Sequence, residues 1–176
     1  MTTGLDAVKA ACLLFIAVVL QISIASGIDI LNGRPDLLLV TLVVVALLRG
    51  SIFGAVAGFA AGLLHDMGTF GTLGFMALLY TLLGYWIGRY GETTGRDRSH
   101  APVVAVAAAT VVFAFAALVL HFMLGDAAPA RQVLVESLVP TLMLNLLLAI
   151  PMYAFVSRIL RPPTWSDRAR EVRLLG

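Results

Sequence analysis

Six apolar runs, separated by short polar or glycine-rich stretches, make up most of the sequence. A helix needs about 20 mostly apolar residues to cross a hydrocarbon core of roughly 30 Å, and the first run is that long. The second and third runs are shorter, so they predict tilted, re-entrant or broken spans. The runs cover residues 7–27, 37–48, 51–66, 73–89, 102–124 and 133–160.

Composition identifies the class of protein. Of the 176 residues, 60% are hydrophobic and 12% are charged, which excludes an ordinary soluble domain. Inside lipid the backbone must satisfy its own hydrogen bonds, so the runs predict an all-α integral membrane protein with six transmembrane helices in residues 1–161. Residues 162–176 begin with Pro-Pro and form a basic cytoplasmic tail, either disordered or helical on anionic lipid. No groove of arginines and aromatic residues indicates nucleic-acid binding.

Positive charge is distributed unevenly between the two sides that six spans would create. With both termini in the cytoplasm, ten of the 12 basic residues lie inside, and only Arg34 and Arg131 lie outside. Cytoplasmic excess of lysine and arginine sets the orientation of membrane proteins, so the sequence predicts a multi-pass protein of the cytoplasmic membrane with both termini inside. The inner set is Lys9, Arg49, Arg89, Arg96, Arg98, Arg158, Arg161, Arg168, Arg170 and Arg173.

A stripe of glycines marks the third run. Gly50, Gly54, Gly58 and Gly62 recur every four residues, and Asp66 falls on the next step. In lipid, small residues let two helices approach backbone to backbone. Each four-residue step turns the helix by about 400°, so the stripe drifts and suits a helix that crosses at an angle. We expect a glycine zipper that packs either inside the fold or against a partner protein.

Three polar side chains, Asp36, His65 and Asp66, lie at the predicted outer ends of spans. An ionisable group near a membrane end marks a functional site for a ligand, ion or partner when it is neither solvated nor paired. The structural alternative is that Asp66 caps the following glycine-rich turn. Asp36 follows Pro35 at the start of the second run, where an acid faces the positive end of the helix dipole. Both alternatives stay open for Asp66.

Gln21 and Asn145 lie within apolar runs and need hydrogen-bond partners there. Bonds between helices are favoured over ligand contacts for both. The chain has three histidines and no metal-spaced cluster, Ser/His/Asp set or phosphate loop, so we expect no cofactor, no metal and no enzymatic activity.

Residues 34–89 resemble the MreD family of rod shape-determining proteins. The resemblance rests on Pro35-Asp36, Arg49-Gly50, the string GAVAGFAAGLLHD from Gly54 to Asp66, Gly74 and Gly84. It covers about a third of the chain. It implies a fold similar to the substrate-capture subunit of energy-coupling-factor transporters, without enzymatic activity. It also implies partners in the bacterial cell-elongation machinery: MreC, RodA and a class B penicillin-binding protein.

Two functions from different classes fit these observations. The first is a membrane scaffold that binds the proteins directing lateral peptidoglycan synthesis. The alternative is a substrate-binding subunit of an energy-coupling-factor vitamin transporter, which needs polar residues that converge on a pocket from the later spans. Those spans are mostly Ala, Val and Leu, which favours the scaffold. Self-association stays open.

The predicted topology has a direct test. In a Cys12→Ala background, single cysteines introduced at Thr94 and Ala128 should react oppositely with a membrane-impermeant thiol reagent applied to intact cells. Ala128 should be labelled from outside and Thr94 only after the membrane is opened, because basic residues gather on the side of Thr94. Labelling of Thr94 from outside contradicts the six-span topology.

Overall fold

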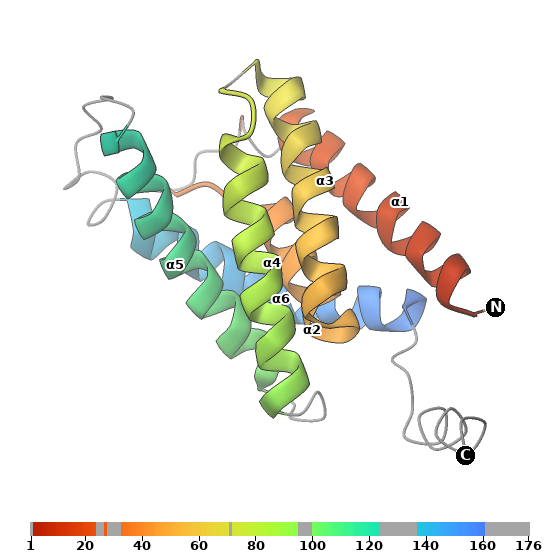
Figure 1. Cartoon of the computed structure of the whole chain (residues 1–176). Coiled ribbons are helices and arrows are strands. Elements are labelled where there is room, and N and C mark those ends of the chain that lie inside the picture. The colour runs from red at the N-terminus through yellow and green to blue at the C-terminus, as the bar shows by residue number, and fades with distance from the viewer. Residues whose placement is uncertain are drawn as a thin grey trace.

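The computed structural model describes residues 2–23, 27, 33–70, 72–94, 100–123 and 137–160. These residues form an all-helical bundle, which confirms the predicted class (Figure 1). The tail at 162–176 lies outside the described residues. The helices are α1 Thr2–Ser23, α2 Leu37–Arg49, α3 Ser51–Thr69, α4 Phe75–Thr94, α5 Ala101–Met123 and α6 Leu138–Ile159.

Four of the six helices, α1, α3, α5 and α6, are long and apolar enough to cross a membrane. Helix α3 is longer than the apolar run at 51–66 indicated, because the helix continues past His65 and Asp66 to Thr69. Helix α2 has only 13 residues, a length of about 20 Å at 1.5 Å per residue, which is short of the roughly 30 Å core. Six complete crossings therefore stay a prediction.

Helix α2 is the centre of the bundle and contacts all five other helices. Every residue from Leu38 to Leu48 is buried, including Thr41. A helix that is apolar on all sides needs cover on all sides, and here protein provides that cover. The Thr41 hydroxyl donates to the Leu37 carbonyl oxygen at 2.7 Å, so its polar group is satisfied within the helix. The shortness of α2 is tolerated because its ends meet protein groups.

Helices α3 and α4 run antiparallel and side by side in the bundle (Figure 1). Their backbones touch along the glycine stripe. A Cβ atom added to Gly54, Gly58 or Gly62 would lie under 3.0 Å from backbone atoms of Gly84, Tyr80 and Ala77 respectively, a separation that real Cβ atoms essentially never show. On α4, Gly84 and Gly88 meet Gly54 and Gly50 in the same way. We call this contact the α3–α4 seam.

The opposite side of α3 carries large apolar side chains. Ile52 is 79% exposed and Val56 is 66% exposed, whereas Gly54 and Gly58 on the seam are buried. An exposed apolar surface of this kind is unfavourable in water and suited to lipid. The helix therefore presents a small-residue face to α4 and a large-residue face to the bilayer.

Replacing a seam glycine should destabilise the bundle. In Gly58→Leu the new side chain meets the Tyr80 carbonyl group, and overpacking of this kind typically costs about 1–3 kcal/mol. Ala60→Leu is the matched control, because Ala60 lies on the exposed side of the same helix. The free energy of unfolding in detergent, measured for both variants, checks this expectation. Equal stability of the two variants would show that the seam is not close-packed.

Candidate functional site: the polar groups at the helix ends

The start of α2 is held by side chains from two other helices. The first amides of a helix have no partners inside it, and inside a bundle water does not supply them. The Asp36 carboxylate caps α2 by accepting from the Leu39 amide at 2.8 Å. The Gln21 side-chain oxygen of α1 accepts from the Leu37 amide at 2.8 Å, and the Asn145 side-chain oxygen of α6 accepts from the Asp36 amide at 2.9 Å.

This arrangement extends to α4 and α5. Asn145, which is fully buried, donates from Nδ2 to the Thr110 hydroxyl oxygen at 3.1 Å. The Tyr80 hydroxyl donates to Asp36 Oδ2 at 3.3 Å, and its ring stacks on Phe113 with centroids 5.1 Å apart. Five helices therefore meet at one set of hydrogen bonds. We call it the α2 cap cluster; it consists of Gln21, Asp36, Tyr80, Thr110 and Asn145.

The start of α4 is held by Asp66 from the end of α3. Asp66 is only 2% exposed. Its carboxylate accepts from the backbone amides of Gly74 at 2.9 Å, Met76 at 3.2 Å and Ala77 at 3.3 Å. Asp66 thus has the capping geometry of the structural alternative, facing α4 rather than an open outer surface.

His65, the neighbour of Asp66, has a different environment. It is half-buried, and its Nδ1 atom is buried without a hydrogen-bond partner. Among the described residues, no hydrogen bond joins His65 to Asp66 or to Asp36. The three polar residues that the sequence places at the outer ends of spans therefore divide into the α2 cap cluster, the α4 cap and a half-buried imidazole.

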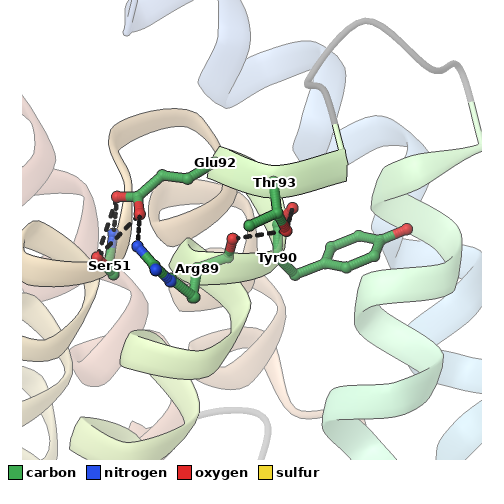
Figure 2. Close-up of polar contacts among 5 residues, drawn as sticks. All are labelled: Ser51, Arg89, Tyr90, Glu92 and Thr93. Carbon is green, nitrogen blue, oxygen red and sulfur yellow. Dashed lines mark hydrogen bonds and ion pairs between the residues drawn. The ribbon is translucent and has the colours of Figure 1, made fainter.

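At the opposite end of the seam, Glu92 of α4 holds the start of α3 (Figure 2). Its carboxylate accepts from the Ser51 amide at 2.8 Å and from the Ser51 hydroxyl at 3.0 Å, and Arg89 donates to it at 3.5 Å. The Ser51 amide in particular lowers the pKa of the Glu92 carboxyl, which lies past the apolar part of α4. Each helix of the α3–α4 pair is thus capped by a carboxylate from the end of the other.

An ion pair fixes α1 to the end of α2. Arg49 Nη2 lies 2.7 Å from Asp6 Oδ2, and the two side chains are 13% and 18% exposed. Lys9 adds a longer contact of 3.8 Å to the same carboxylate. Partly buried charges need such a partner, because an unpaired charge there is strongly unfavourable. Arg49 and the following Gly50, whose φ is 97°, therefore form a fixed corner between α2 and α3.

Several of these residues escaped the sequence analysis. Gly84 and Gly88 form the α4 side of the seam, and their spacing of four residues was the available signal, although Gly84 entered the sequence analysis only through the family resemblance. Thr110 and Glu92 carried no local signal, because their partners lie 35 and 41 positions away in the sequence.

The described residues contain no group of three or more His, Cys, Asp or Glu side chains able to hold a metal ion. Two cavities of the described part lie between α4 and α5, and their linings are almost wholly apolar. The buried polar groups described above instead bond to helix ends and to neighbouring helices. The geometry is that of a membrane bundle stabilised from within.

Comparison with known families agrees with this architecture. The family model for rod shape-determining protein MreD matches residues 1–162, nearly the whole chain. The chain belongs to the MreD family. Membership assigns it to the bacterial membrane and to rod-shape determination, and the family is not a known enzyme family. Searches of curated proteins and of solved structures gave no match.

The two members of the His65-Asp66 pair should respond differently to removal. Asp66→Ala leaves three amides at the start of α4 without their acceptor, and loss of a capping side chain typically costs about 0.5–2 kcal/mol. His65→Ala should cost less, since the imidazole Nδ1 has no hydrogen-bond partner to lose. Unfolding in detergent measures both variants. A larger loss from His65→Ala would contradict the capping role of Asp66.

Proposed function

We propose that the chain is a non-enzymatic scaffold of the cell-elongation machinery, holding partner membrane proteins that direct lateral peptidoglycan synthesis. The supporting observation is that its buried polar side chains form hydrogen bonds inside the bundle. Asp36, Asp66 and Asn145 bond to helix-start amides or to neighbouring helices. A pocket for a polar substrate needs such groups to point into a cleft. The two cavities described above have apolar linings instead.

The partners we propose are MreC, RodA and a class B penicillin-binding protein, as implied by the family resemblance. Large apolar side chains cover the outer surface of the bundle and offer contact area to partner spans within the membrane. The glycines of the seam face α4, so they support partner binding by fixing the shape of the bundle. We place both termini in the cytoplasm on the charge asymmetry of the sequence.

The transporter alternative lacks a specific observation in its favour. A transporter subunit needs polar residues that converge on a pocket from the later helices. Tyr80, Thr110 and Asn145 are polar residues of these helices, but all three are bonded within the α2 cap cluster. The fold likeness to a substrate-capture subunit stays an expectation from the resemblance.

Depletion of the chain in its rod-shaped bacterium, followed by microscopy and affinity purification of a tagged copy, tests the proposal. We expect cells to become round, the tagged copy to restore rods, and MreC, RodA and the penicillin-binding protein to co-purify with it. Asp66→Asn should weaken retention of partners at most.

Two outcomes would count against the scaffold. One is that depleted cells keep their rod shape while the tagged copy retrieves none of the three partners. The other is saturable binding of a vitamin to the purified chain that Asp66→Asn abolishes, which would favour the transporter subunit.

A further inference from the structure

A groove of about 490 Å³ lies between α4 and α5, and several of its lining residues, such as Trp86 and Val112, are exposed on the surface of the bundle. One wall consists of large side chains of α4, including Leu82, Trp86 and Ile87. The other wall consists largely of small side chains of α5, including Ala105 and Ala108. Its α5 wall extends from Val104 to Ala116, about 18 Å at 1.5 Å per residue.

The groove is polar at one end only. Among its lining residues, Trp86 and Tyr90 alone carry polar side-chain atoms, and both lie toward the end of α4. Tyr90 points away from Ser51 and Glu92 (Figure 2) and lines the groove together with α5. Tryptophan and tyrosine prefer the headgroup level of a bilayer. This end therefore corresponds to the membrane surface, and the apolar remainder extends into the hydrocarbon.

The polar end of the groove also lies beside the amino end of a helix. Helix α5 begins there, and the amino end of a helix carries partial positive charge that attracts phosphate. His100 is exposed one turn before the lining residue Val104, and its carbonyl oxygen accepts from the Val104 amide at 3.1 Å. The nearby carboxylate of Glu92 is bonded to Ser51 on the side facing α3. The mouth therefore complements an anionic group, and the groove complements a hydrocarbon chain.

We propose that this groove binds one acyl chain of an anionic phospholipid, with the lipid phosphate at the start of α5 beside His100. The volume lies in the range of sites for single small ligands, about 300–1,000 Å³. A length near 18 Å approximates one leaflet of a hydrocarbon core of roughly 30 Å, whereas a partner helix would need the full thickness. The bulky α4 wall also keeps a second helix from the close backbone approach that alanines allow.

The chain contains a natural probe for this site. It has two tryptophans, so Trp165→Phe leaves Trp86, on the groove wall, as the only one. The purified Trp165→Phe chain is reconstituted in phosphatidylcholine bilayers that contain a small fraction of phospholipid with brominated acyl chains, which quench tryptophan on contact. Brominated phosphatidylglycerol should reach half-quenching at about two- to five-fold lower mole fraction than brominated phosphatidylcholine, the size expected for a helix-terminus charge effect.

Three variants separate a site from general attraction to charge, and a fourth is held in reserve. Ala108→Phe fills the groove and should remove the preference, whereas Ala60→Phe on the exposed side of α3 should leave it unchanged. His100→Glu should remove the preference for phosphatidylglycerol, whereas brominated lipid should still quench Trp86. Ala108→Val is a milder groove variant, to be used if Ala108→Phe does not fold.

Equal quenching by the two brominated lipids would overturn the proposal. It would also be overturned if Ala108→Phe and Ala108→Val kept the same preference for phosphatidylglycerol as wild type. If Ala108→Phe releases co-purifying membrane proteins while the lipid preference persists, the groove docks a protein helix and the lipid site is wrong. None of these readouts depends on cell shape, so the scaffold function and the lipid site can fail independently.

Discussion

In the hydrocarbon of a bilayer no hydrophobic force draws α3 toward α4, because lipid tails are as apolar as leucine. Close packing must hold the pair together instead, and dispersion contacts weaken steeply with a gap of even half an ångström. The seam places Gly54 against Gly84 and Gly58 against Tyr80 with no room for a side chain. This backbone contact fixes the spacing of the two helices that cover one side of α2, so the burial of α2 depends on it.

The second requirement comes from backbone polarity. Within a membrane bundle, helix-start amides need protein partners, because water is scarce there. The chain meets this need with side chains from other helices: Asn145 and Gln21 at the start of α2, Asp66 at the start of α4, and Glu92 at the start of α3. Because each partner lies on another helix, these bonds also set the relative positions of the helices, and α2 tolerates its length of 13 residues.

Hydrophobic pattern predicted the six helices, since long apolar runs leave helix as the only structure that satisfies the backbone in lipid. The hydrophobic pattern did not predict the end of α3. The polar residues His65 and Asp66 indicate the end of a helix, whereas the helix continues through them to Thr69. The need of Asn145 for a partner was predictable from burial. The identity of that partner was not, because Asp36 lies 109 positions away and only the packing of α6 against α2 brings them together.

The same distribution of polar groups separates the interior of the bundle from its surface. Charged and amide side chains cap the helix ends, and glycines form the close contact of the seam. The outer faces of α3, α5 and α6 carry large apolar side chains such as Val56, Phe115 and Leu147. A bundle built in this way has a fixed shape and an apolar exterior. Those are the properties that a membrane scaffold of the MreD family needs in order to hold partner spans.

Magic-angle-spinning NMR in bilayers tests the seam most directly, with ¹³C at glycine Cα and at tyrosine carbonyl carbons. A Cβ atom added to Gly58 would lie 2.6 Å from the Tyr80 carbonyl carbon, so the account predicts a strong through-space correlation between these two residues. Tyr80→Phe should remove that correlation, because position 80 then carries no labelled carbonyl, although the variant also loses the hydroxyl that donates to Asp36. The bonded neighbours Tyr90 and Gly91 supply an internal reference. If wild type gives the reference signal and no Gly58–Tyr80 correlation, α3 and α4 do not touch through their backbones and the account is wrong.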